Sequence, residues 1–308
     1  MLARVLGAGL PAGVDVGIGD DAAVLDGAHG PGRLVWTIDE QVEGTHFERA
    51  LVGWRDVGWR SFMAAASDVA AMGADPWCAL AALVLPDSID DAALEAIAAG
   101  QGDAAAALGT RVVGGNLARG RGRDVSIATT LIGTCARAVP RAGARPGDGV
   151  WIAGEVGLAA AGLRALRSAR GDAPGLARAV DAWRRPRALV AEGRAMGAAA
   201  HAAVDVSDGL ACDVGRIADA SHVRIALDAD SVAASAALVE AAAALGADPL
   251  DLALHGGEDY ALVVTSPHAI DGFRRIGEVL EGSGLTLRGP GGEQELDPKG
   301  YDHFEDAR

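Results

Sequence analysis

Lysine is almost absent from this sequence. Lys299 is the single lysine among 27 basic residues, and the rest are arginine. A P-loop of the GxxxxGK[ST] type is therefore excluded, because that motif requires a lysine. If the protein handles phosphate groups, their charge must be neutralised by arginine, backbone amides or metal ions. The net charge of −15 also argues against a nucleic-acid surface, which requires basic patches.

Cysteines are few, and long apolar runs are missing. Cys78, Cys135 and Cys212 lie far apart and form neither a CxxC pattern nor a disulfide framework, so we expect buried free thiols. No apolar run of about 18 residues lacks charge, which argues against a membrane span. The N-terminal residues lack a clear signal-peptide core and cleavage site, so we expect a cytoplasmic protein.

A chain of 308 residues favours two domains over one core. The stretch "RAGARPGDGVWIAG", residues 141–154, is rich in Arg, Gly and Pro and marks the predicted boundary. Before it we expect strands and helices in irregular alternation, with strands at 33–38, 78–85, 111–113 and 124–135 and helices at 57–73 and 87–109. After it the expected elements are strands at 150–153 and 202–207, helices near 157–170 and 184–200, a helix opening at 207–209, the segments 223–228 and 260–266, and a helix at 231–245. This pattern predicts a two-lobed α+β or α/β protein.

Two adjacent aspartates stand in "GIGDDAAVL", residues 17–25. Further aspartates share this setting, each beside a strand end, a turn or a helix among small residues: Asp21, Asp39, Asp68, Asp205 and Asp208. Carboxylates placed in this way can converge on one cleft and offer the oxygen ligands that Mg²⁺ prefers. The alternative is ordinary structure, in which Ser207 or Asp208 caps the helix that follows.

The same stretch partly matches a dinucleotide-binding fingerprint. Gly17, Gly19 and Ala22 have the spacing GxGxxA, and Asp39 follows about 20 residues later, as that fingerprint asks. The fingerprint also needs a helix directly after the glycines, whereas glycine and proline at 27–32 interrupt the chain too early. Two aspartates at the turn would repel a pyrophosphate, so the pattern does not favour a dinucleotide site.

Eight motifs occur in an order that resembles the thiamine-monophosphate kinases, bacterial members of the superfamily that includes aminoimidazole ribonucleotide synthetase. They are "GIGDDAAVL", "TIDEQVEGTHF", "SDVAAMGADP", "GGNLARG", "RAGARPGD", "DVSDGLACD", "GGEDYALV" and "GYDHF". They span nearly the whole chain, and "EGTHF" with "GGEDY" narrows the resemblance to the kinases. It implies a two-domain α+β fold, with residues 1–140 as an N-terminal ATP- and Mg-binding domain whose sheet pairs across a homodimer. Residues 141–308 would be a C-terminal α/β sandwich that completes the ATP and substrate site.

The implied activity is ATP-dependent phosphorylation of thiamine phosphate to thiamine diphosphate by direct γ-phosphoryl transfer, assisted by several Mg²⁺ ions. The resemblance gives Mg²⁺ ligands at Asp21, Thr37, Ile38, Asp39, Asp68, Asn116, Asp205 and Asp208, and of these we assign Asp205 and Asp208 to catalysis. It gives nucleotide contacts at Gly115, Asn116, Arg141 and Ser207, and thiamine phosphate contacts at His46, Glu258, Tyr301 and Phe304. Plain structural roles stay open for three of them: a loop contact for Arg141, a buried, hydrogen-bonded histidine for His46 and an acidic turn for Glu258.

The chain departs from the family pattern near the expected metal site. Asn116 stands where the family usually has aspartate, and Ile38 stands where it has threonine. Glu40 replaces an expected neutral residue, which suggests the hypothesis that it restores the charge lost at Asn116. These changes keep open two alternatives: a related enzyme acting on another substrate, and a non-catalytic Mg-ATP-binding regulatory protein.

Overall fold

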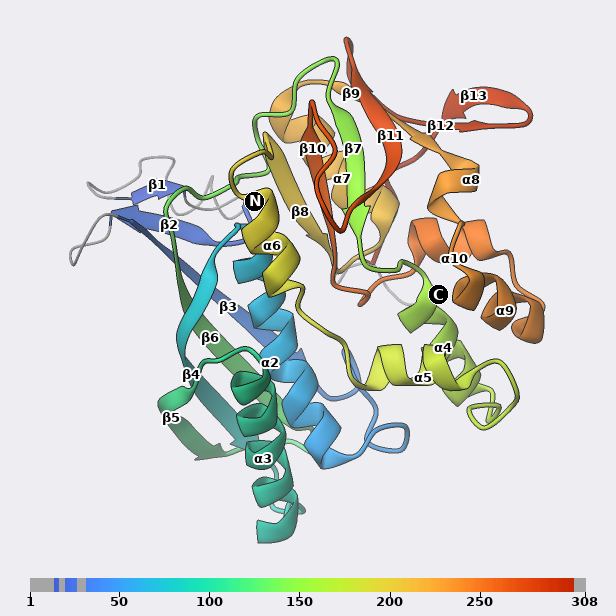
Figure 1. Ribbon diagram of the computed structural model, residues 1–308. Helices are drawn as coiled ribbons and strands as arrows, with labels where there is room; N and C mark the ends of the chain where they lie inside the picture. Colours follow the sequence, from blue (N-terminus) through green and yellow to red (C-terminus); the bar gives the residue numbers. More distant parts are fainter. Residues whose placement is uncertain (1–13, 17–19, 27–31, 302–308) are drawn as a thin grey trace. The chain divides into compact units, whose positions relative to one another are not determined.

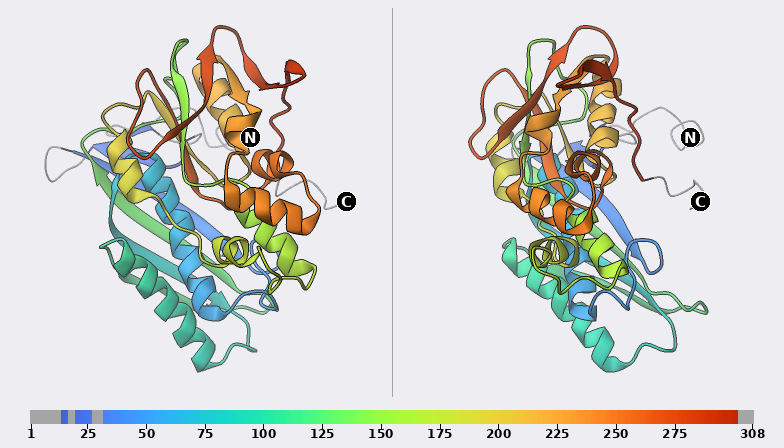
Figure 2. Two further views of the ribbon diagram at one scale, coloured as in Figure 1. Left: turned by 45° about the vertical axis from the view of Figure 1, so that its right-hand side comes forward. Right: turned by 90° about the vertical axis from the view of Figure 1, so that its right-hand side faces the viewer.

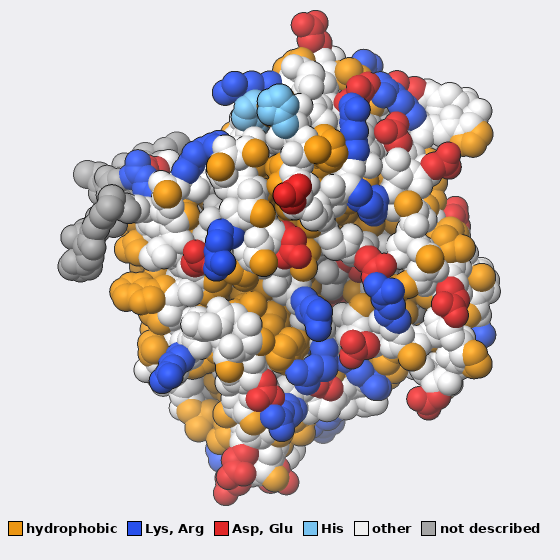
Figure 3. Space-filling view, viewed as in Figure 1, with side chains coloured by type: hydrophobic (Ala, Val, Ile, Leu, Met, Phe, Trp, Pro, Cys, Tyr) orange, Lys and Arg blue, Asp and Glu red, His pale blue; other side chains and the backbone are white. Residues whose placement is uncertain are grey.

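The structure, a computed structural model, describes residues 14–16, 20–26 and 32–301. The chain divides into two compact units, Met1–Ala138 and Val139–Arg308, and each is built around its own sheet (Figure 1). Within the described residues, no helix is long and apolar enough to cross a membrane. On the face shown in Figure 3, acidic and basic side chains are interspersed with hydrophobic ones rather than grouped by sign.

The first unit contains a six-stranded sheet in the order β1-β2-β3-β6-β4-β5. Its strands are β1 (Val14–Val16), β2 (Ala23–Asp26), β3 (Arg33–Val42), β4 (Asp75–Leu85), β5 (Val112–Arg119) and β6 (Ser126–Cys135). Strands β4 and β5 run parallel, whereas the other neighbours are antiparallel. Helices α2 (Trp54–Ala71) and α3 (Asp91–Ala107) lie side by side against the sheet (Figure 2).

Two glycines let α2 and α3 approach closely. A Cβ added at Gly58 would lie 2.0 Å from the carbonyl oxygen of Ile97, and one at Gly100 would lie 1.9 Å from that of Arg55. Any larger residue at either position would push the helices apart, so these glycines fix the α2–α3 spacing.

The sheet of the first unit has a helix-covered face and an open face. Along β3, Val35, Thr37 and Gln41 are buried, whereas Trp36 and Ile38 between them are exposed. This alternation follows from the two-residue period of a strand. We call the side formed by Trp36, Ile38, Leu80 and Val84 the open face, because these apolar side chains are 40 to 68% exposed.

The second unit contains a seven-stranded sheet in the order β13-β12-β9-β11-β7-β10-β8. Its strands are β7 (Gly149–Ala153), β8 (Ala202–Val206), β9 (Arg224–Asp228), β10 (Ala261–Ser266), β11 (Arg274–Leu280), β12 (Gly284–Gly289) and β13 (Gly292–Glu295). Its helices are α4 (Leu158–Arg167), α5 (Ala177–Arg184), α6 (Val190–Met196), α7 (Leu210–Ser221), α8 (Ala229–Val232), α9 (Ala236–Leu245) and α10 (Pro249–His255).

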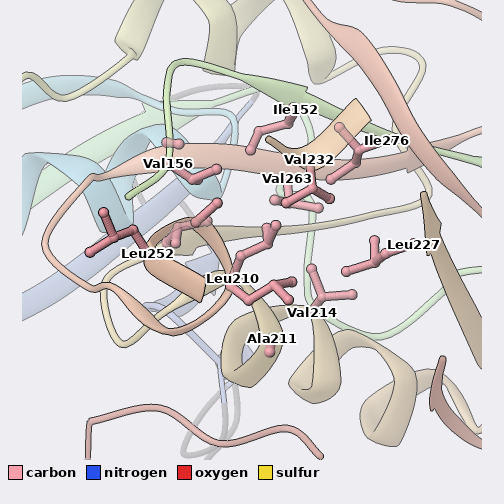
Figure 4. Close-up of a cluster of buried hydrophobic side chains, with 14 of the residues drawn as sticks. Ile152, Val156, Leu210, Ala211, Val214, Leu227, Val232, Leu252, Val263 and Ile276 are labelled. Carbon is pink, nitrogen blue, oxygen red and sulfur yellow. The ribbon is translucent and has the colours of Figure 1, made fainter. Parts of the chain in front are cut away.

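Both faces of this second sheet are covered at its centre, because every residue of β8 and of β10 is buried. On one face Leu210 and Val214 of α7 pack with Leu227 and Val263 of the sheet in a large apolar core (Figure 4). A smaller cluster that includes Met196 covers the other face. The buried strands and the packed α7 give the segment between β8 and α7 a rigid frame.

The predicted α+β class is confirmed, and most predicted elements are present with shifted ends. Two helix predictions were wrong in extent. The helix expected near 184–200 is shorter, Val190–Met196, because Pro186 disfavours helix in the residue before it and α5 already ends at Arg184. The helix expected at 231–245 is two helices, α8 and α9. The N-cap of α9 is Ser235, whose Oγ accepts the Leu238 N–H at 3.2 Å.

Sequence analysis also missed several elements, among them β11 and α10. In the segment with the partial dinucleotide fingerprint, a strand rather than a helix begins at Ala23. The helix N-terminus that such a fingerprint needs is therefore not formed there.

Candidate functional site

One buried carboxylate organises the turn between β8 and α7. Oδ2 of Asp213 accepts the backbone N–H groups of Ser207, Asp208 and Gly209 at 3.1, 3.1 and 3.2 Å, and Asp213 is fully buried. Successive N–H groups that point to one centre form a concavity for an anion, and here the protein fills it with its own side chain. The N-cap residue of α7 is Gly209 and no side chain caps the helix, so Ser207 and Asp208 do not have the capping role left open above.

Asp208 is joined to the same carboxylate by an arginine. Arg216 donates one N–H to Oδ2 of Asp208 and another to Oδ1 of Asp213. Burial lowers the pKa of Arg216, but the two carboxylates outweigh it and the pKa is raised. Oδ1 of Asp208 has no hydrogen-bond partner among the described residues, and the side chain is 22% exposed. One oxygen of Asp208 is thus held while the other is available.

The loop after α10 lies against this turn. The N–H of Glu258 donates to the carbonyl of Ser207 at 2.8 Å, and the N–H of Tyr260 donates to that of Val206 at 2.9 Å. A Cβ at Gly257 would lie 2.4 Å from the Ser207 oxygen, so this approach requires glycine. The structure therefore brings Ser207 and Glu258 together, although they are far apart in the sequence.

The C-terminal motif reaches the turn as well. The N–H of Tyr301 donates to the backbone carbonyl of Asp208 at 3.0 Å, and the Tyr301 residue is 51% exposed. Phe304, the other aromatic residue of "GYDHF" in the expected site, lies outside the described residues. Of the two, Tyr301 is the one placed beside Asp208.

Glu258 is held by an aromatic side chain. The indole N–H of Trp183 donates to Oε2 of Glu258 at 2.8 Å, and Trp183 is buried. Glu258 and Tyr260 have φ angles of 64° and 52°, a left-handed backbone that is costly for residues other than glycine. Such conformations cluster at ligand sites, where the surrounding structure enforces them.

Between these two strained residues, Asp259 anchors the loop to α4. Its carboxylate accepts the N–H of Gly157 at 2.6 Å and that of Ala159 at 2.9 Å. Burial raises the pKa of Asp259 to about 7, against the opposing effect of these backbone hydrogen bonds. The loop that carries Glu258 is thereby tied to the first turn of α4.

Arg141 and Asp205 lie on neighbouring segments of the second unit. The Arg141 carbonyl accepts the Ser221 hydroxyl at 3.2 Å. Burial raises the pKa of the Cys212 thiol, and the charge of Arg141 is among the influences that lower it, so Arg141 acts electrostatically on the first turns of α7. Asp205 is buried on β8, on the opposite side of the strand from Val204.

In the first unit, Asp21 and Asp68 come together beside Thr37. The Thr37 hydroxyl donates to Oδ2 of Asp68 at 2.6 Å and lies 3.2 Å from the Asp21 carbonyl. Carboxylate oxygens of Asp21 and Asp68 lie within 4.8 Å of each other. Opposite oxygen ligands of Mg²⁺ are about 4.2 Å apart, so the donor set fits one hard cation. Oδ1 of Asp20 accepts the N–H of Asp21 at 2.9 Å, so Asp20 supports the turn.

Asp39 lies on the same helix-covered side of β3 as Thr37. The Gln41 side-chain amide donates to Oδ1 of Asp39 at 3.4 Å. Ile38, between Thr37 and Asp39, points to the open face and is 68% exposed, so only its backbone lies with the acidic residues.

Asn116 is placed on the open face. It pairs with Ala82 of β4, in the same cross-strand row as Glu40 of β3, and follows Gly115 on β5. Glu40 and Asn116 are three strand spacings apart, about 14 Å. The hypothesis that Glu40 replaces the charge lost at Asn116 therefore fails within one chain, and Glu40 instead accepts the Ser126 hydroxyl at 2.6 Å.

His46 belongs to a local turn after β3. Its Nδ1 accepts the N–H of Val42 at 3.0 Å, so the ring proton of the neutral form is on Nε2. Its carbonyl accepts an N–H of Arg60 at 3.3 Å. His46 is therefore hydrogen-bonded, as its structural alternative predicts, but it is partly exposed rather than buried.

Sequence reasoning missed Asp213, Arg216, Trp183 and Asp259. A signal existed for the first two, because "DGLACDVGR" places an acid in the first turn of the predicted helix and an arginine three residues later. No sequence pattern indicated that Trp183 would contact Glu258, since 75 residues separate them.

Comparison with known proteins gives matches along the whole chain. Residues 19–135 match the family model for the N-terminal domain of AIR synthase related protein, and residues 145–288 match that for its C-terminal domain. The thiamine-monophosphate kinase of Aquifex aeolicus is 32% identical over 93% of this chain and 92% of its own length. That of Mycobacterium tuberculosis (strain H37Rv) is 37% identical over 90% and 83%.

Solved structures agree with these matches. A structure of AaThiL complexed with AMPPCP and TMP superimposes with a TM-score of 0.88 at 31% identity, covering 98% of this chain and 94% of the other. The thiamine-monophosphate kinase of Stenotrophomonas maltophilia gives a TM-score of 0.75 at 32% identity, with 93% of each chain covered.

Proposed function

Because the chain belongs to the thiamine-monophosphate kinase family, we propose that it transfers the γ-phosphoryl group of ATP to thiamine phosphate. A terminal phosphate oxygen of thiamine phosphate forms the new bond to the γ-phosphorus, the bond to the β,γ-bridging oxygen breaks, and ADP leaves. The observation that carries this proposal is the match over 98% of the chain to AaThiL complexed with AMPPCP, an ATP analogue, and TMP.

The residues in both units suit this chemistry. Phosphoryl transfer depends on positioning the reactants and on neutralising the charge of the phosphate groups. Because the chain has a single lysine, this charge must be neutralised by arginine, backbone amides or metal ions. Mg²⁺, when bound, would neutralise charge on the transferred phosphate and on the leaving group. We assign Mg²⁺ binding to oxygen-bearing groups of each unit. In the first unit these are Asp21, Thr37, the backbone of Ile38, Asp39, Asp68 and Asn116, and in the second unit they are Asp205 and Asp208.

Asp208 is proposed as a central residue of the second unit, with Asp205 behind it on β8. One oxygen of Asp208 is held by Arg216 and the other is available, which suits a residue that acts on a cation-bound phosphate. For the nucleotide we propose contacts from Gly115, Asn116, Arg141 and Ser207. The charge of Arg141, which already influences Cys212 on α7, suits a phosphate group.

For thiamine phosphate we propose contacts from His46, Glu258, Tyr301 and Phe304. The thiazolium ring of this substrate is positively charged, and a carboxylate with aromatic neighbours recognises such a ring. Glu258 has this setting, since the Trp183 indole holds one of its oxygens.

We also propose a homodimer that pairs through the open face. Trp36, Ile38, Leu80 and Val84 are 40 to 68% exposed there, and contiguous apolar patches of this kind mark interfaces. We expect Ile38→Glu to shift the protein to a monomer by light scattering at micromolar concentration, because it would bury a charge. A wild-type monomer at that concentration would contradict this assembly.

The test of the function is ADP formation by the full chain with ATP and Mg²⁺, with and without thiamine phosphate. We expect turnover that depends on thiamine phosphate, and a loss of roughly 100-fold or more in Asp208→Asn. Asp219→Asn is the matched control, because Asp219 is an exposed acid on the same helix. Binding of Mg-ATP without turnover would instead favour a changed substrate or a regulatory protein.

A further inference from the structure

Arg216 links two carboxylates that differ in exposure. Asp213 is fully buried, whereas the Asp208 side chain is 22% exposed, and one guanidinium donates to an oxygen of each. The two N–H groups of a guanidinium point in fixed directions, so this contact sets the orientation of both carboxylates.

The cluster formed by Asp208, Cys212 and Asp213 has the spacing of a cation site, with its ligand atoms within 4.8 Å of one another. Its charge is already compensated, however. Asp213 accepts three backbone N–H groups and one N–H of Arg216, and Arg216 supplies the positive charge. The cluster is therefore a support for Asp208 rather than a further metal site.

The backbone of Asp208 is also fixed, from two directions. Its N–H donates to Asp213, and its carbonyl accepts the N–H of Tyr301 at 3.0 Å. With the backbone fixed, only the side-chain torsions of Asp208 could still rotate, and the contact of its Oδ2 with Arg216 restricts them. With backbone and Oδ2 both held, Oδ1 has a defined direction.

We propose that Arg216, anchored on Asp213, is a positioning residue that orients Oδ1 of Asp208 toward a divalent cation. This inference rests on the proposed function, because it takes Asp208 to be a cation ligand. Partners that hold the second atom of a metal ligand commonly change metal affinity by roughly 10- to 100-fold when they are removed.

Mn²⁺ alone is a suitable probe, since electron paramagnetic resonance measures the free ion and the test needs no turnover. The relevant Mn²⁺ sites are those that are lost in Asp208→Asn. We expect Arg216→Met to weaken the affinity of these sites by about 10-fold or more. Arg216→Lys keeps the charge but loses the two-pronged contact, so it should remain weakened.

The matched control is Arg288→Met. Arg288 also joins two carboxylates in the second unit, those of Glu278 and Glu293, and we expect its replacement to leave Mn²⁺ binding unchanged. The Asp208→Asn/Arg216→Met double variant separates positioning from general destabilisation. If Arg216 acts through Asp208, its loss has no further effect in the Asp208→Asn background.

Unchanged or tighter Mn²⁺ binding in Arg216→Met would overturn the inference. So would wild-type Mn²⁺ affinity in Arg216→Lys. An equal loss of Mn²⁺ affinity when Arg216→Met is added to Asp208→Asn would overturn it as well. If Asp208→Asn shows a defect in these cases, the proposed function stands and only the role of Arg216 fails. If the wild type and Asp208→Asn bind Mn²⁺ equally, the assignment of Asp208 as a cation ligand fails as well.

Discussion

The acidic residues assigned to the site are held in different ways in the two units. In the first unit neutral donors orient the carboxylates: the Thr37 hydroxyl donates to Asp68 and the Gln41 amide donates to Asp39. In the second unit a cation, Arg216, joins the carboxylates of Asp208 and Asp213. A neutral donor fixes direction without cancelling charge, whereas a guanidinium does both. Arg216 therefore compensates part of the charge of Asp208 and orients its carboxylate as one ligand.

The largest effect on activity is expected when a carboxylate of the first unit loses its charge. Asp68→Asn removes a full charge from the Asp21–Asp68 pair, so we expect roughly 100- to 1,000-fold slower ADP formation and a larger rise in the Mg²⁺ concentration needed than in Asp208→Asn. Titration of activity with Mg²⁺ measures both.

The control for that experiment is Asp91→Asn, since Asp91 is an exposed acid in the first turn of α3. If Asp208→Asn requires more Mg²⁺ than Asp68→Asn does, the ranking of the two groups is reversed and the comparison is wrong.

A smaller effect on activity is expected when Asp68 keeps its charge but loses the hydrogen bond from the Thr37 hydroxyl. Thr37→Val leaves Asp68 without its 2.6 Å hydrogen bond, which is worth about 1.5 kcal/mol to a charged group and so about 10-fold in activity. The Mg²⁺ dependence should change less than in Asp68→Asn, because the charge remains.

Thr37→Ser keeps the hydroxyl and is the matched variant, expected to stay within about 3-fold of wild type by the same assay. Equal losses in the serine and valine variants would show that the methyl group, rather than the hydrogen bond, is what matters at position 37.

Much of this arrangement could be predicted from the sequence, because it depends on local pattern. The position of Asp208 followed from the predicted helix start, whereas Asp39, expected just after a strand at 33–38, lies within β3. The side of the sheet on which a residue lies depends on register, which one strand does not reveal, so the distance of Asn116 from Glu40 was not foreseen.

Contacts between distant segments were also beyond sequence reasoning. The approach of Glu258 to Trp183 and of Tyr301 to Asp208 requires the packing of the whole second unit. Gly257 and Gly300, which precede Glu258 and Tyr301, lie close to other backbone segments, but the sequence does not identify which segment each one approaches.

The last prediction concerns stability rather than activity. Asp259 of the second unit, like Asp213, is held by backbone N–H groups, but among the described residues no arginine contacts it. Burial raises the pKa of Asp259 to about 7. The folded protein then binds a proton between about pH 4 and pH 7 that the unfolded chain releases, so the free energy of unfolding falls as pH rises through 7. Asp259→Asn cannot titrate, and its stability should lack this fall.

We therefore expect the stability of the wild type relative to Asp259→Asn to decrease between pH 5 and pH 7, by at most about 3 kcal/mol, and to level off above pH 8. Thermal unfolding at unit pH steps measures it, at about 2 °C per kcal/mol for a chain of this size. A difference that stays constant between pH 5 and pH 8 would show that the N–H groups of Gly157 and Ala159 outweigh burial and keep Asp259 ionised. Asp259 would then be a buried, ionised carboxylate, as Asp213 is, but one held by backbone N–H groups without an arginine. Among Asp208, Asp213 and Asp259, the need for an arginine would then apply to Asp208 alone.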